Sequence, residues 1–202
     1  MSIRAVLFDI GGILELNPPT GWRERWESEL ALRPGDLDKR LEDVWRDAAV
    51  GSITEQVMED TIRRRLGLQD EQMDRFRNDM WDDYLGSPND ELIDYFGGLR
   101  SRCRTGIISN SAVGARVREQ ERYGFDDLCE LIVYSHEVGV SKPDRRIYEI
   151  TCERMNLQPA EAVFLDDVEE NVVAARELGF HAVWFVDNRQ AVREIEGHLC
   201  QP

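Results

Sequence analysis

The segment from Ser87 to the C-terminus alternates short apolar runs with longer segments of helical spacing. The apolar runs predict strands over 105–109 (TGIIS), 131–134 (LIVY), 162–165 (AVFL) and 181–186 (HAVWFV). The segments between them predict helices over 88–100, 112–123, 144–155 and 168–178, with a short last helix to about residue 199. Strands that alternate with helices are joined by right-handed crossovers, which produce a parallel sheet with helices on both faces. The alternation therefore predicts an α/β fold.

An apolar run at 3–8 (IRAVLF) predicts one more buried strand, at the N-terminus. The residues that follow are rich in charge and place apolar side chains at three- and four-residue steps, so we predict three or four helices and no strand over 20–86. We therefore divide the chain into an α/β core, 1–15 and 87–202, and a helical insert, 16–86. The insert leaves from the carboxyl end of the first strand, the edge where open parallel sheets bind ligands. It is placed to cover a site as a cap.

Acidic residues outnumber basic ones, with 40 Asp and Glu against 25 Lys and Arg, and the formal net charge is −15. A negative field of this size favours solubility and disfavours binding to nucleic acid and to anionic membrane surfaces. It also repels phosphorylated ligands at long range, so a site for them needs local positive groups. We expect a small-molecule partner, no nucleic acid and no membrane, and the residues leave a monomer and a homodimer equally open.

The cysteines and histidines lie apart from one another, with no disulfide or metal-ligand spacing: Cys103, Cys129, Cys152, Cys200, His136, His181 and His198. Reduced thiols in the cytoplasm are the simplest account of these cysteines, and a His/Cys metal site is not expected. No apolar run is long enough to cross a bilayer, and Arg4 and Asp9 interrupt the N-terminal run, unlike a signal peptide. We therefore expect a cytoplasmic protein.

Polar side chains follow the predicted strands: Asp9, then Ser109 and Asn110, then Lys142 in GVSKPD, then Asp166 and Asp167 with Asn171 one helical turn further on. Each of them alone has an ordinary use, as a turn or helix cap or as loop surface. Because the carboxyl ends of parallel strands lie at one edge of the sheet, however, these side chains should converge. Acids, a hydroxyl and a lysine in one cleft suit phosphoryl transfer: a carboxylate can attack phosphorus, while donors and a cation hold the phosphoryl oxygens. Clustered carboxylates beside phosphate favour Mg²⁺.

The segments VLFDIGG, IISNS, SKPD and FLDDVEEN resemble, in content and order, the motifs of the haloacid dehalogenase-like (HAD) hydrolase superfamily. The resemblance spans nearly the whole core and implies a three-layer, Rossmann-like fold in which 16–86 form a small C1-type helical cap. It is strongest towards phosphatase-like members, which include sugar-phosphate phosphatases and the N-terminal domain of soluble epoxide hydrolase. The cap should then decide the substrate. Its aromatic side chains, at Trp22, Trp26, Trp45 and Trp81, fit packing better than ligand contact.

The resemblance also implies roles for individual residues. It implies Asp9 as the nucleophile and a Mg²⁺ ligand, and Asp167 as the second acidic ligand, supported by Asp166 and Asn171. Ser109 and the Asn110 backbone would bind the phosphoryl group, and Lys142 would orient Asp9 and neutralise charge.

One position departs from the family pattern. Phosphatases of the family carry an acid two residues after the nucleophile, which protonates the leaving group and later activates water. Gly11 stands there in this chain, so the side-chain role is unfilled, while its backbone carbonyl remains available to the metal.

Three functions follow from this pattern, and we favour the first. It is an Mg²⁺-dependent phosphatase that forms an aspartyl-phosphate on Asp9, because acid–base help contributes only about 10²–10⁴-fold and its loss need not abolish turnover. The second is a 2-haloacid dehalogenase, which uses neither the second acid nor a metal but has uncharged residues where this chain has Asp166 and Asp167. The third is a catalytically weak or non-catalytic binding protein on the same scaffold, which Gly11 would allow.

Overall fold

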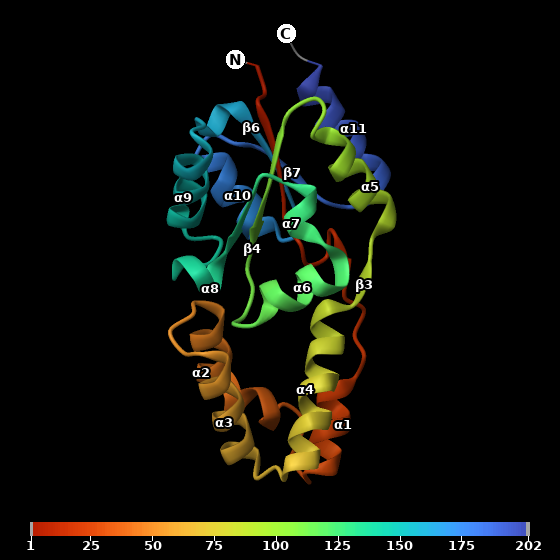
Figure 1. Cartoon of the computed structure of the whole chain (residues 1–202), viewed down its shortest axis with the longest axis vertical. Helices are drawn as coiled ribbons and strands as arrows, with labels where there is room; N and C mark the ends of the chain where they lie inside the picture. Colours follow the sequence, from red (N-terminus) through yellow and green to blue (C-terminus); the bar gives the residue numbers. More distant parts are fainter. Residues whose placement is uncertain (1, 201–202) are drawn as a thin grey trace.

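A five-stranded parallel sheet lies at the centre of the core in the computed structural model, which describes residues 2–200 (Figure 1). Its strand order is β5-β4-β1-β6-β7, with β1 Ala5–Phe8, β4 Arg104–Ser109, β5 Leu131–Tyr134, β6 Ala162–Asp166 and β7 His181–Trp184. Every neighbouring pair in it is parallel. The predicted α/β fold is therefore confirmed, although β1 and β7 are each two residues shorter than the apolar runs suggest.

Helices cover both faces of this sheet, and the side chains of β1 alternate between the two cores that result. Val6 and Phe8 pack on one face with α5 Asp90–Leu99, α7 Phe125–Leu128 and α11 Asn188–Leu199. Ala5 and Leu7 pack on the other with α9 Arg145–Met155 and α10 Glu169–Glu177. A strand buried on both sides has no polar face, which is why this segment is apolar at every position. The remaining short elements of the core are α6 Ala115–Tyr123, α8 Ser135–Val138 and the 3₁₀ turn Pro159–Glu161.

The insert consists of four helices: α1 Trp22–Glu29, α2 Asp36–Ala49, α3 Glu55–Leu66 and α4 Asp70–Leu85. They lie at the lower end of the molecule in Figure 1 and share an apolar core that includes Trp26, Leu41, Ile62 and Phe76. Within residues 2–200, no helix has the length and apolar character that crossing a membrane requires.

A short antiparallel pair, which the sequence analysis did not predict, connects the insert to the core. It joins β2 Glu15–Leu16, where the chain leaves the core, to β3 Ser87–Pro88, where it returns. Gly86 adopts a φ of +58°, and a Cβ there would lie 2.2 Å from the carbonyl oxygen of Leu16. Glycine therefore permits the close approach of the two connecting strands.

Candidate active site

Three carboxylates meet at the carboxyl edge of the sheet. Asp9 directly follows β1, Asp166 ends β6 and Asp167 comes next. Because β1 is hydrogen-bonded to β6 in register, oxygens of all three side chains lie within 4.8 Å of one another. Ser109 is buried at the end of β4, the other neighbour of β1. The structure thus brings the predicted acids and the hydroxyl-bearing strand to one edge.

Lys142 provides the positive charge among these acids. Its Nζ lies 2.7 Å from Oδ1 of Asp9 and 2.7 Å from Oδ2 of Asp166, and its side chain is fully buried. The side chain of Asn110 holds the lysine backbone from both sides, since Asn110 Nδ2 donates to the Lys142 carbonyl and Asn110 Oδ1 accepts from the Lys142 N–H, at 2.8 and 2.7 Å. The resemblance implied only a backbone role for Asn110, and this positioning contact of its side chain was not predicted.

The two adjacent acids, Asp166 and Asp167, have different surroundings. Asp166 is fully buried and accepts hydrogen bonds from Lys142 Nζ, from the Val168 N–H at 2.8 Å and from Asn171 Nδ2 at 3.0 and 3.1 Å. Asp167 is exposed, so its carboxylate can reach a ligand. The hydrogen bonds of Asp166 therefore fix the position of Lys142, with Asn171 as a supporting donor. Asp167, next to it, keeps its carboxylate exposed to a ligand.

Burial and mutual repulsion disfavour the charged forms of these acids. Burial raises the pKa of Asp9 to about 7, and Asp166 adds to the shift while Lys142 opposes it. Burial, followed by the charge of Asp166, also raises the pKa of Asp167. One ammonium thus does not fully compensate three carboxylates. A second cation would compensate them, and a donor set of carboxylate oxygens with a backbone carbonyl, such as that of Gly11, suits Mg²⁺.

The two glycines after Asp9 differ in what they require. Gly12 has a φ of +71°, which strains any other residue, and a Cβ there would lie 2.2 Å from Oδ2 of Asp167, so that carboxylate would have to move. A Cβ added at Gly11 would instead have Asn17 Oδ1 as its nearest neighbour, at 3.9 Å, which is an ordinary contact. The turn therefore has space for a Cβ at position 11, the position at which phosphatases of the HAD family carry their acid.

A second group of buried acids, missed by the sequence analysis, lies between the insert and the core. Glu15 is 1% exposed, and its Oε1 has no hydrogen-bond partner within residues 2–200. Glu119 is also buried and accepts from the hydroxyls of Tyr84 and Tyr134. Burial, then the charge of Glu119, raises the pKa of Glu15 to about 9, and burial raises the pKa of Glu119 to about 7. The only sequence signal was an acid inside the apolar stretch ILEL.

These acids should make stability depend on pH. A carboxyl whose pKa is higher in the folded than in the unfolded state keeps its proton on folding, so stability falls as pH rises from the unfolded pKa to the folded one. For Glu15 this window runs from 4.5 to about 9. We expect the melting temperature of Glu15→Gln to fall less between pH 6 and pH 9 than that of the unsubstituted protein. Glu121→Gln, an exposed position on α6, is the matched control, and equal slopes for all three proteins would contradict the prediction.

The family model of the haloacid dehalogenase-like hydrolases matches residues 3–179. The chain belongs to this family. Among curated relatives, acyl-CoA dehydrogenase family member 10 of Mus musculus is 27% identical over 100% of this chain, and bifunctional epoxide hydrolase 2 of Sus scrofa is 26% identical over 97%. The chain spans only 20% and 39% of the length of those two proteins. D-ribitol-5-phosphate phosphatase of Bacteroides thetaiotaomicron is 23% identical over 88% of this chain and 89% of its own length.

Solved HAD structures share the fold. A HAD-family enzyme of Bacteroides thetaiotaomicron superposes with a TM-score of 0.84 and 21% identity, over 96% of this chain and 99% of that one. The same enzyme in complex with magnesium and inorganic phosphate gives a TM-score of 0.78 at 22% identity, over 93% and 96%. L-2-haloacid dehalogenase of Xanthobacter autotrophicus gives 0.60 at 19% identity, over 99% and 85%. At these identities the likeness shows the fold and does not distinguish the two chemistries.

Proposed function

We propose that this HAD hydrolase is an Mg²⁺-dependent phosphatase of a small phosphorylated metabolite and that it acts through a phosphorylated Asp9. The observation that carries the proposal is the group formed by Asp9, Asp166, Asp167 and Lys142 at one sheet edge, with carboxylate oxygens within 4.8 Å of one another. Three acids around one lysine leave negative charge that a bound divalent cation would neutralise.

Each residue then has a chemical task. The Asp9 carboxylate attacks phosphorus, a bond forms between its oxygen and phosphorus, and the ester oxygen leaves with the bonding electrons and takes a proton from water. Lys142 holds Asp9 in position and neutralises charge, while Ser109 Oγ and the Asn110 N–H bind phosphoryl oxygens. Water then hydrolyses the acyl phosphate and returns Asp9 to its starting state. Mg²⁺, held by Asp9, Asp167 and the Gly11 carbonyl, would supply positive charge next to the phosphoryl oxygens.

The relatives support a phosphate substrate. One relative, which aligns over 88% of this chain and 89% of its own length, is named as a D-ribitol-5-phosphate phosphatase. A structurally similar enzyme has been solved with magnesium and inorganic phosphate. Sugar and polyol phosphates are therefore within the proposed class.

The dehalogenase alternative is supported by the structural likeness to L-2-haloacid dehalogenase. Dehalogenation on carbon needs no metal, however. Without a metal, Asp166 and Asp167 would repel the negative charge of Asp9 and would have no part in the reaction. The non-catalytic alternative is supported by Gly11 alone, and it gives no reason for the buried contacts that fix Lys142 against Asp9.

A hydrolysis panel tests the proposal. With Mg²⁺ we expect phosphate release from at least one phosphomonoester, and we expect loss of that release in EDTA with recovery when Mg²⁺ is added back. Chloride release from a 2-chloro acid in EDTA would replace the phosphatase by a dehalogenase. If neither reaction is detected at any metal concentration, the chain is a binding protein and the proposal is wrong.

A further inference from the structure

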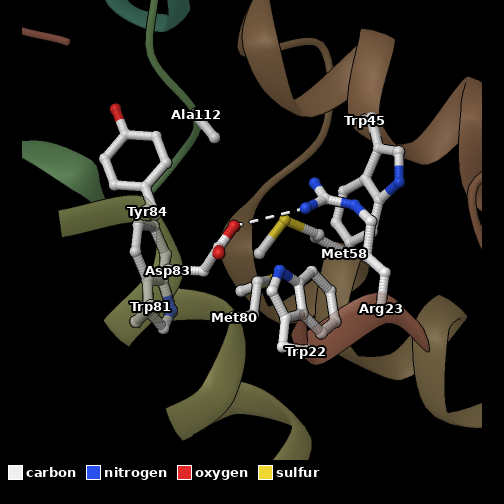
Figure 2. Close-up of a pocket in the computed structure, with 9 residues that line it drawn as sticks. All are labelled: Trp22, Arg23, Trp45, Met58, Met80, Trp81, Asp83, Tyr84 and Ala112. Atoms are coloured by element: carbon white, nitrogen blue, oxygen red, sulfur yellow. Dashed lines mark hydrogen bonds and ion pairs between the residues drawn. The ribbon is translucent and has the colours of Figure 1, made fainter. Parts of the chain in front are cut away.

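Trp184 is the one tryptophan of the chain that lies outside the insert. It ends β7, the outermost strand of the sheet, and it is 45% exposed. The tryptophans of the insert are packed within it instead, and Figure 2 shows Trp22, Trp45 and Trp81 around an internal pocket. A ring that stays in contact with water contributes little to a hydrophobic core. Packing therefore does not account for a tryptophan at position 184.

The indole N–H group of Trp184 donates to the backbone carbonyl of Asp167 at 2.9 Å. An indole nitrogen is a donor only, so this hydrogen bond has a single possible direction. The neighbouring contact between the same two segments runs from the Phe185 N–H to the Asp166 carbonyl, at 3.0 Å. Because β6 ends at Asp166, the indole binds the first carbonyl beyond the strand, in the turn that leads to α10.

This contact completes the support of the Asp167 backbone. The peptide unit that joins Asp167 to Val168 is held at both ends, since its carbonyl accepts from Trp184 and its N–H donates to Oδ1 of Asp166 at 2.8 Å. The preceding peptide unit is held by Phe185 through the Asp166 carbonyl. Peptide units are planar, so fixing these two fixes φ and ψ of Asp167. The direction in which the Asp167 side chain leaves the backbone therefore depends on Trp184.

Trp184 is itself held by the last helix. Gln190, in α11, donates from Nε2 to the Trp184 carbonyl at 3.0 Å and accepts at Oε1 from the Val186 N–H at 3.1 Å. One amide thus fixes the chain on both sides of Phe185, directly after β7. The contacts form a continuous path from α11 through Trp184 to the backbone of Asp167.

We infer that Trp184 is a positioning residue for the metal: its indole holds the turn after β6 so that the Asp167 carboxylate is directed towards Asp9 before a metal binds. The inference rests on the proposed function, in which Asp167 is a Mg²⁺ ligand. Carboxylate oxygens of Asp9 and Asp167 already lie within 4.8 Å of each other without an ion. A ligand that is oriented in advance loses less conformational freedom on binding, so the contacts that orient it increase metal affinity.

Removing the indole N–H group tests the inference. Trp184→Phe keeps an aromatic ring and removes only the donor. We expect the Kd for Mg²⁺, measured by calorimetry without substrate, to rise about 10-fold, the lower end of what contacts to the groups around a metal ligand contribute. This change should exceed any change in kcat at saturating Mg²⁺, because a bound ion restores the orientation of Asp167. Gln190→Ala should change the Kd in the same direction with Trp184 in place.

Trp26→Phe is the matched control for this measurement. It also removes an indole N–H group, but that group donates to Asp79 within the insert, at 2.8 Å, so the Kd for Mg²⁺ should stay the same. An unchanged Kd in Trp184→Phe, or an equal rise in Trp26→Phe, overturns the inference and leaves the phosphatase function standing. If the unsubstituted protein binds no Mg²⁺, the proposed metal dependence and the inference are both wrong.

Hydrogen exchange in the unsubstituted protein decides the inference even if the variants do not fold. Each of the five tryptophans gives one indole N–H signal in a ¹H–¹⁵N spectrum. Coupling between two binding events is reciprocal, so a contact that increases Mg²⁺ affinity is itself stabilised by Mg²⁺ to the same extent. Adding Mg²⁺ alone should therefore slow exchange of the Trp184 indole hydrogen by up to about 10-fold and leave that of Trp26 unchanged. Equal exchange of Trp184 with and without saturating Mg²⁺ overturns the inference.

Discussion

Replacing Asp9 by asparagine is expected to lower kcat for every phosphomonoester by about 10⁴-fold or more. Losses of this size are typical when the nucleophile is removed from a set of catalytic residues that act together. The amide has nearly the same shape as the carboxylate but cannot form the acyl phosphate. In the unsubstituted protein Asp9 is held by Lys142 at 2.7 Å, so the side chain is already oriented for attack. The measurement is phosphate release at saturating Mg²⁺, together with mass spectrometry of acid-quenched protein for a phosphoryl adduct on the peptide that contains Asp9.

The same substitution also changes the charge around Lys142, so its folding must be checked. Asp9→Asn removes one of the two carboxylates that the lysine contacts and leaves Asp166 in place. Thermal melting should therefore show a folded protein with a single transition. Asn17→Ala is a matched control in the same turn, because Asn17 contacts Gly12 but carries no proposed chemical step. Equal turnover of the Asp9→Asn and unsubstituted proteins would remove Asp9 as the nucleophile.

Introducing an acid at position 11 is expected to have the opposite effect. Gly11→Asp should raise kcat for substrates with poor leaving groups, such as alkyl phosphates, by about 10²-fold, the lower end of what general acid–base catalysis contributes. The turn has space for the Cβ of the new residue, since its nearest neighbour would be 3.9 Å away. The measurement is kcat across a series of phosphomonoesters with leaving groups of different pKa. The dependence on that pKa should become weaker in the variant, because a positioned acid protonates the leaving oxygen.

Two glycine substitutions serve as controls for this result. Gly11→Ala fills the same space without an acid and should leave kcat close to that of the unsubstituted protein. Gly12→Ala places a Cβ 2.2 Å from Oδ2 of Asp167 at a φ of +71°, so it should displace the proposed metal ligand and raise the Mg²⁺ concentration needed for activity. If kcat rises as much in Gly11→Ala as in Gly11→Asp, the increase comes from a more rigid turn. The interpretation that the chain lacks a general acid at position 11 would then be wrong.

The convergence of Asp9, Ser109 and Asp166 could be predicted from the sequence because it follows from topology. Each of them ends or directly follows a strand, and parallel strands end at one edge. The position of β1 between β4 and β6 then puts the three ends side by side, whatever the helices between them contain. The roles of these residues remain predictions, since geometry alone does not show a reaction.

The contacts that depend on loop conformation could not be predicted in this way. Asn110 lies next to Ser109 in the sequence, but its side chain turns to the loop that carries Lys142, 32 residues further on. Likewise, Glu15 and Glu119 lie close enough for the charge of one to raise the pKa of the other, although no local pattern connects them. Such contacts depend on how the loops pack over the sheet. Loops can change without altering the hydrophobic periodicity from which helices and strands are predicted.

The antiparallel pair of β2 and β3 has a consequence for how such chains diversify. Glu15 and Leu16 lie directly opposite Pro88 and Ser87, so the core encloses the entire insert as if it were one hairpin loop. Closing a loop costs only slightly more as the loop grows, about 0.6 kcal/mol for each doubling of its length. The core can therefore accept inserts of very different size and sequence at this point with little change in its own stability. A new leaving-group pocket could be acquired by exchanging the segment between the two strands, while the residues at the sheet edge stay as they are.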